Sequence, residues 1–113
     1  MTRVNLVKHG FVKWPEESFS DDGNRFDAYR VGERVRVTKC LYKGKVYLNG
    51  TIRNGDLNFY YVMKLPHYKS VGRLNGVDIK TLTDEDLIKL YDDCIEFEKE
   101  YNAKELEIKN GGN

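Results

Sequence analysis

Apolar and polar positions alternate along most of the chain between residues 29 and 79. In the segment 34–42 (RVRVTKCLY), Val35 and Val37 alternate with Arg34 and Arg36. A period of two predicts a strand with apolar side chains on one face and guanidinium groups on the other. The segment 57–65 (LNFYYVMKL) alternates in the same way, and its core face is expected to carry Leu57, Phe59, Tyr61, Met63 and Leu65.

Turn signals divide this region into consecutive antiparallel strands. They are Gly32 and the pairs at 43–44, 54–55 and 75–76. A further Asn-Gly pair, at 49–50, lies inside the run 46–53 and indicates either a bulge or a second turn.

The first 28 residues carry weaker signals. Residues 4–14 (VNLVKHGFVKW) predict one or two short strands interrupted near Gly10, which Pro15 ends because proline lacks an N–H donor. Residues 15–28 are rich in turn formers, so we expect a loop that Phe19 and Phe26 anchor to the core.

The C-terminal segment predicts an amphipathic helix over residues 84–103. Thr83 precedes three acidic residues, the pattern of an N-cap followed by a negatively charged first turn. Apolar residues then recur at steps of three and four, with Ile88 widening the stripe, and those expected to pack on the sheet are Leu87, Leu90, Tyr91, Cys94, Ile95 and Phe97.

One charged residue disturbs this helix. Glu98 falls near the middle of the apolar stripe at helical spacing, where an unpaired carboxylate is costly to desolvate. We therefore expect a basic side chain beside it.

Together these patterns predict an α+β fold, an antiparallel β-meander or small barrel with the helix packed on it. With 113 residues the chain is expected to be one domain over residues 1–109, with a β-rich part at 1–80, a helical part at 81–109 and a disordered tail at 110–113. Since no apolar run is long enough for a membrane span and two cysteines make no disulfide framework, we expect a cytoplasmic protein that does not bind membranes. No pattern indicates an oligomeric state.

The charges are divided unevenly along the chain. Residues 1–80 hold 15 Lys/Arg and 8 Asp/Glu, whereas residues 81–113 hold 4 and 10. A basic surface attracts polyanions and an acidic one engages basic proteins. Because the two parts also attract each other, part of the positive field is expected to be neutralised internally.

Catalytic and metal-binding patterns are absent from the sequence. Its candidate nucleophiles and ligands are Cys40, Cys94, His9 and His67, and none lies in a recognisable local motif. Cys94 falls on the apolar helix face, as expected of a core thiol. We therefore expect no enzyme, no cofactor and no metal site.

Two charged surfaces remain as candidate binding sites. The segment 29–45 combines cations with tyrosines, as a surface that follows phosphates and stacks on bases requires, and with Tyr47 its candidates are Arg30, Arg34, Arg36, Tyr42, Lys43, Lys45 and Tyr47. On the helix, regularly spaced carboxylates could imitate a phosphate backbone or engage a basic protein, and these are Asp92, Asp93, Glu96 and Glu100.

The segments 31–37 (VGERVRV), 46–52 (VYLNGTI) and 58–62 (NFYYV) resemble the strand order of Tudor/KOW-type small barrels. That resemblance covers about a third of the chain and implies a barrel that binds peptides or nucleic acid. The aromatic cage of Tudor domains has no match here, so no ligand is implied.

The chain is rich in Tyr, Lys and Asp and ends in a predicted helix that includes residues 82–91. In these general features it is similar to small accessory proteins of large tailed phages. This resemblance implies binding to, and inhibition or redirection of, a host or defence protein. The first expectation is therefore a non-catalytic protein-binding module, with another protein as partner. The alternatives are a nucleic-acid-binding small barrel and a protein that sequesters a small anionic, nucleotide-like ligand.

Overall fold

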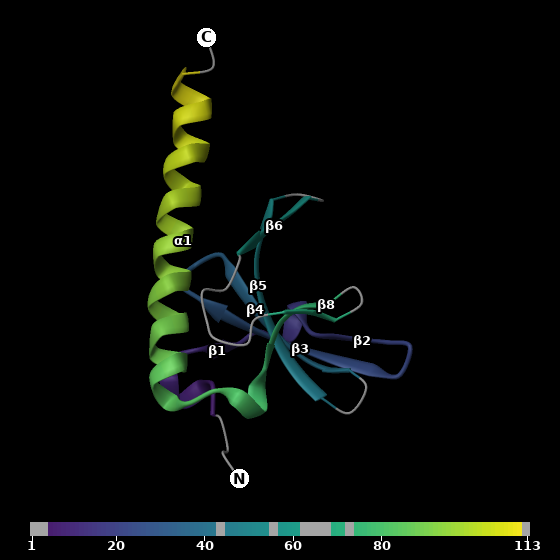
Figure 1. Cartoon of the computed structure of the whole chain (residues 1–113). Helices are drawn as coiled ribbons and strands as arrows, with labels where there is room; N and C mark the ends of the chain where they lie inside the picture. The colour runs from purple at the N-terminus through teal and green to yellow at the C-terminus, as the bar shows by residue number, and fades with distance from the viewer. Residues whose placement is uncertain (1–4, 43–44, 55–56, 62–68, 72–73, 112–113) are drawn as a thin grey trace.

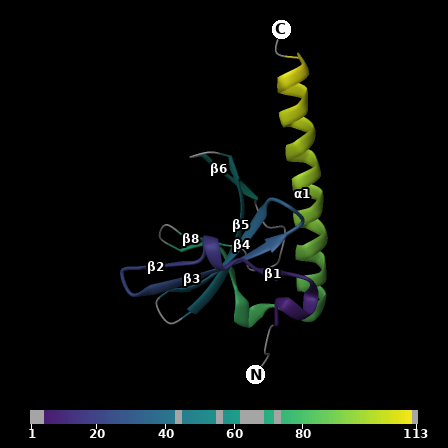
Figure 2. The same ribbon diagram turned by 180° about the vertical axis from the view of Figure 1, so that it is seen from behind.

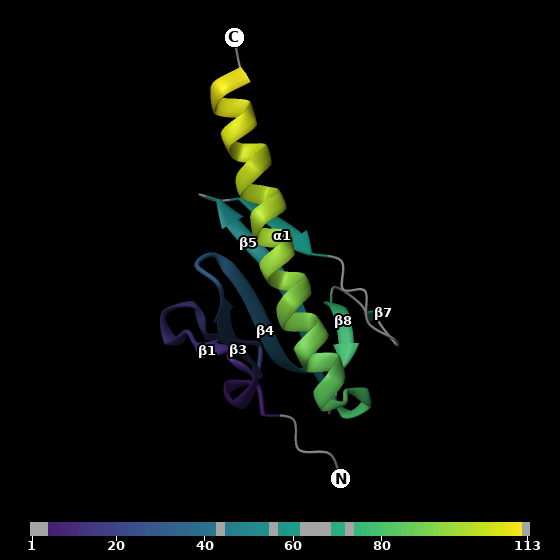
Figure 3. The ribbon, with the colours of Figure 1, turned by 90° about the vertical axis from the view of Figure 1, so that its left-hand side faces the viewer.

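A computed structural model describes residues 5–42, 45–54, 57–61, 69–71 and 74–111. An antiparallel sheet is crossed on one face by a single long helix (Figures 1 and 3). The predicted α+β class is confirmed. The strands are β1 (Val12–Lys13), β2 (Phe19–Asp21), β3 (Asn24–Val31), β4 (Val35–Tyr42), β5 (Lys45–Asn54), β6 (Leu57–Tyr61), β7 (Lys69–Val71) and β8 (Leu74–Asp78), and the helix is α1 (Asp84–Gly111).

The strands follow the order β1-β3-β4-β5-β8-β7, with β2 added to β3 and β6 added to β5. Two strands share one edge of β5, because β6 pairs with residues 50–54 and β8 with residues 47–48. Within the described residues this path has two open ends, at β1 and β7. The sheet is therefore not closed, and the meander describes it better than the barrel.

The strand pairing shows that two of the predicted turn or bulge positions are wrong. The β4–β5 register runs without a shift from the pair of Val35 and Ile52 to that of Tyr42 and Lys45, so the pair at 49–50 is neither a bulge nor a turn. The pair at 75–76 lies inside β8 rather than in a turn. A Cβ on Gly76 would collide with the carbonyl oxygen of Leu48, so this glycine allows close strand approach.

The N-terminal region is more regular than the sequence indicates. Residues 4–14 contain the 3-10 turn η1 (Val7–His9) and a single short strand, β1. The expected loop at 15–28 is instead the 3-10 turn η2 (Pro15–Glu17) followed by the β2–β3 hairpin. Phe19 stacks on Phe26 with 4.7 Å between ring centroids but is itself 53% exposed, so it does not anchor a loop in the core.

The core lies between α1 and one sheet face. Val31, Val35, Val37, Leu48 and Ile52 supply the sheet side. All six apolar helix residues expected to pack there do so, with Leu87, Leu90 and Cys94 fully buried and the other three partly buried. Ile88 is 53% exposed and does not widen the stripe.

The sequence predicts the N-terminal end of the helix more accurately than its C-terminal end. At the N-terminus, the Thr83 hydroxyl accepts the Asp86 N–H at 3.2 Å and the Asp86 carboxylate accepts the Thr83 N–H at 3.0 Å, which confirms the N-cap. At the C-terminus the helix continues to Gly111, through part of the expected tail. Its last turns stand beyond the sheet (Figures 1 and 2), and there Leu106 and Ile108 are largely exposed.

Candidate functional site

Glu98 joins the helix to the β3–β4 turn through backbone amides. Its carboxylate accepts hydrogen bonds from the N–H groups of Glu33, Arg34 and Val35, the shortest being 2.7 Å from Arg34. No basic side chain contacts it in the described part of the chain, so the predicted basic partner is wrong there. Three consecutive N–H donors can compensate a half-buried carboxylate, and Gly32, with φ +67°, turns the chain so that they point at it.

The Arg34 side chain contributes to the same junction by another route. Its guanidinium donates to Glu105 at 2.8 Å and to Asn102 at 3.0 Å, and it lies 4.9 Å from the centre of the Tyr101 ring. The hydrogen bond to Glu105 raises the pKa of Arg34. Because Arg34 lies in the turn before β4, it does not follow the strand alternation that the sequence indicates.

The predicted basic surface is therefore only partly present. Arg30 donates to the carbonyl of Gly32 at 2.7 Å. Arg36 donates to Thr51 at 3.2 Å and has its guanidinium 4.0 Å from the Glu17 carboxylate.

The aromatic and lysine members of that surface are placed less favourably. Tyr47 is only 4% exposed, so its assignment as a stacking surface residue is wrong. Lys45 is exposed at the start of β5. The side chain of Tyr42 and all of Lys43 lie outside the described residues. Among the described residues, the predicted candidates therefore do not form one exposed patch.

The predicted acidic surface is exposed on the arc of α1 that faces away from the sheet. Asp92, Glu96 and Glu100 are exposed, and none of the three pairs with a cation in the part of the chain that the structure describes. Asp93 is more buried and lies 3.3 Å from the Lys89 ammonium group. Three of the four predicted carboxylates therefore form an open row, which we call the acidic row, at helical positions i, i+4 and i+8.

The two thiols have the environment of core residues. Cys94 is fully buried, and burial first, then the Asp93 charge, raises its pKa to about 12. Burial also raises the pKa of Cys40, which is 2% exposed. A thiol with a raised pKa is a poor nucleophile near neutral pH.

Of the two histidines, the structure describes only His9. His9 Nε2 lies 3.0 Å from the Asp84 carboxylate and links η1 to the start of α1. His67 falls outside the described residues. No group of three or more potential metal-ligating side chains occurs in the described ranges.

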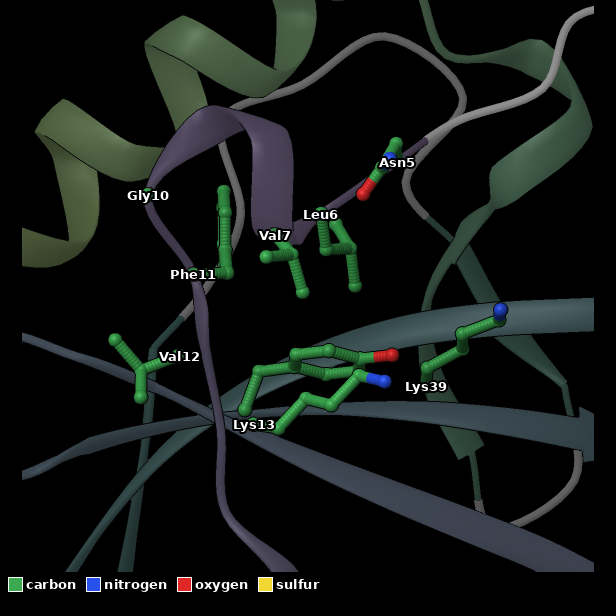
Figure 4. Close-up of a pocket in the computed structure, with 9 residues that line it drawn as sticks. Asn5, Leu6, Val7, Gly10, Phe11, Val12, Lys13 and Lys39 are labelled. Atoms are coloured by element: carbon green, nitrogen blue, oxygen red, sulfur yellow. The ribbon is translucent and has the colours of Figure 1, made fainter.

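A pocket between η1 and the sheet was not indicated by the sequence (Figure 4). It has a volume of about 900 Å³. Its lining comes from three separate segments, and only their folding brings these residues together: Asn5, Leu6, Val7, Gly10, Phe11, Val12, Lys13, Tyr29 and Lys39.

Searches for related proteins give no family assignment. Comparison with protein-family models, curated proteins and solved structures finds no match to this chain. None of the described helices is long and apolar enough to cross a membrane.

Proposed function

We propose that this chain is a non-catalytic protein-binding module that presents the acidic row of α1 to a basic surface of another protein. In this role it acts as a phage-type inhibitor or modulator of a host or defence protein. Both cysteines are free and buried, which agrees with work in a reducing compartment such as the cytoplasm.

The acidic row is the observation that carries this proposal. Like charges spaced at i and i+4 destabilise a helix by a few tenths of a kcal/mol per pair. Asp92, Glu96 and Glu100 repeat that spacing twice, and Lys99 is exposed on the same arc of the helix without an ion pair to any of the three in the described part of the chain. A basic partner would turn this repulsion into attraction and steer its own approach over long range.

The contacts of the arginines favour this proposal over nucleic-acid binding. A nucleic-acid surface needs cations that reach phosphates. Here Arg34 is engaged by the helix and Arg36 lies beside Glu17, while the exposed carboxylates of α1 repel a phosphate backbone.

A pull-down with charge-neutral variants tests the proposal. Wild-type chain and the variant Asp92→Asn/Glu96→Gln/Glu100→Gln are immobilised and exposed to bacterial extract. The matched control is Glu16→Gln/Asp21→Asn/Asp22→Asn, which removes three exposed carboxylates from the opposite end of the chain. We expect one basic protein to be retained by wild type and control and lost with the helix variant. Equal retention by all three, or no specific retention by wild type, would contradict the proposal.

A further inference from the structure

We propose that the pocket between η1 and strands β1, β3 and β4 binds a small amphipathic anion, an aliphatic chain that carries one carboxylate. The aliphatic chain of the ligand would lie against Leu6 and Val7, and the carboxylate would be held by the ammonium groups of Lys13 and Lys39. This site shares no residue with the acidic row, so it does not depend on the proposed function.

The upper wall of the pocket is apolar. Leu6 and Phe11 are almost fully buried, whereas Val7 is 50% exposed. In Figure 4, Leu6 and Val7 project from the η1 segment towards the strands. Covering the half-exposed Val7 with an aliphatic chain removes apolar surface from water, which favours binding.

The opposite wall supplies the charge. Lys13 pairs with Tyr29 across β1 and β3, and Lys39 pairs with Asp27 across β3 and β4. The alternation of side chains therefore places Lys13, Tyr29 and Lys39 on one face of three neighbouring strands. Figure 4 shows the Lys13 and Lys39 side chains on the strand side of the hollow, opposite Leu6 and Val7.

Little in the described lining opposes an anion there. None of the nine residues that line the pocket is acidic. The nearest carboxylate by register, Asp27, is held by Arg25 at 2.9 Å and lines a neighbouring hollow. Burial, and secondarily the Asp27 charge, raises the pKa of Tyr29, so its hydroxyl stays protonated and can donate to a carboxylate.

The balance of charge and apolar surface selects the ligand class. Two ammonium groups and one phenol supply donors for both oxygens of a carboxylate, and the two positive charges more than compensate its single negative charge. A nucleoside triphosphate carries more charge than two lysines compensate, and its ribose would face Leu6 and Val7. A pocket of about 900 Å³ accommodates a medium-length chain.

Titration with decanoate, below the concentration at which it forms micelles, tests this site. Calorimetry on the full chain is expected to show one saturable site. Decanol, which lacks the charge, and butanoate, which lacks the long chain, should each bind at least about tenfold more weakly, since each loses one of the two contributions. Amide shifts in NMR spectra should centre on Val7, Gly10, Lys13 and Lys39.

Matched variants decide whether the two lysines hold the carboxylate. Lys13→Gln/Lys39→Gln should weaken decanoate binding by at least about tenfold, because both charge-assisted contacts are lost. Lys80→Gln/Lys104→Gln removes two exposed lysines outside the pocket and should leave the affinity unchanged. Absence of saturable decanoate binding, equal binding of decanol, or equal loss in both variants would overturn the proposal.

Discussion

Glu98 holds the helix to the sheet through three amide groups rather than through a cation. Helical spacing identifies this residue as anomalous, because it places a carboxylate among Leu87, Cys94 and Tyr101. The donors could not be predicted, since the backbone N–H groups of residues 33–35 become a carboxylate site only after the turn at Gly32 has formed. Arg34 was wrongly predicted to alternate along a strand for the same reason, because its position depends on that turn.

Two glycine substitutions test this junction. Gly32 and Gly23 both have positive φ, +67° and +82°, so alanine strains the backbone at either position. Only at Gly32 would the new Cβ lie 2.9 Å from both Glu98 carboxylate oxygens, whereas nothing lies within 4 Å at Gly23. Urea unfolding should therefore show Gly32→Ala to be less stable than Gly23→Ala by about 1–3 kcal/mol, the cost of disturbing hydrogen bonds to a charged group.

The same pair in a Glu98→Ala background provides the control. Removing the carboxylate removes the collision, so the stability difference between the two glycine variants should shrink towards zero. If the stability difference between the two glycine variants did not shrink, it would not arise from contact with Glu98.

The raised thiol pKa values give a second residue-scale prediction. Burial keeps Cys40 and Cys94 protonated in the folded chain, so an aromatic disulfide reagent at pH 8 should modify both far more slowly than in the urea-unfolded chain. The unfolded Cys94 thiol ionises near pH 9, so the stability that its burial as a neutral thiol contributes is fully present below that value and is lost as the pH rises towards about 12. A thiol that reacts equally fast in both states would contradict its burial.

At the scale of elements, strong periodicity located the helix and strands but did not always identify the buried face, because Phe59, expected on the core face of residues 57–65, is 40% exposed. The helix and the central strands were predicted because their repeats match the geometry of a buried face. The pair at 75–76 was misread as a turn, since Asn-Gly is a local signal and the close approach of Gly76 to Leu48 arises from long-range pairing. The β2–β3 hairpin was missed because its strands bury little apolar surface, as the exposure of Phe19 shows.

Shortening the helix tests which of its turns support the fold. Tyr101 accepts a hydrogen bond from Asn54 at 2.9 Å and packs on Phe59 with 5.1 Å between ring centroids, and Glu105 binds Arg34. A chain that ends at Leu106 keeps these contacts and should unfold within about 0.5 kcal/mol of the full chain.

A chain that ends at Glu100 loses all of those contacts. It should be less stable by roughly 2–4 kcal/mol, the range for losing a partly buried aromatic side chain, its hydrogen bond and an ion pair together. Circular dichroism during urea titration measures both chains. Equal stabilities would mean that the helix beyond residue 100 does not contribute to the fold.

For the whole molecule, the separation of charge is the property that bears on function. The sequence predicted it, because it needs only counting, but it did not show which charges stay exposed. The fold pairs Arg34 with the helix and leaves the acidic row open. The pocket below η1 was not predicted, since its lysines come from separate strands.

Binding of a generic oligonucleotide tests whether the basic side chains are available to phosphates. At low salt we expect little binding, and the variant Arg34→Ala/Arg36→Ala should not change it, because the guanidinium groups donate to Asn102 and Thr51 of the chain itself. Fluorescence anisotropy measures this. Tight binding that weakens steeply with salt, and more gently in the variant, would instead favour the nucleic-acid alternative.

Site-specific photocrosslinking tests the central claim most directly. A photoreactive amino acid at position 96, in the acidic row, or at position 16, on the η2 turn, is irradiated with the chain in bacterial extract. We expect a discrete adduct with a basic protein from position 96 only, and we expect this adduct to disappear when salt is raised before irradiation. A discrete adduct from position 16 alone, or from neither position, would contradict it.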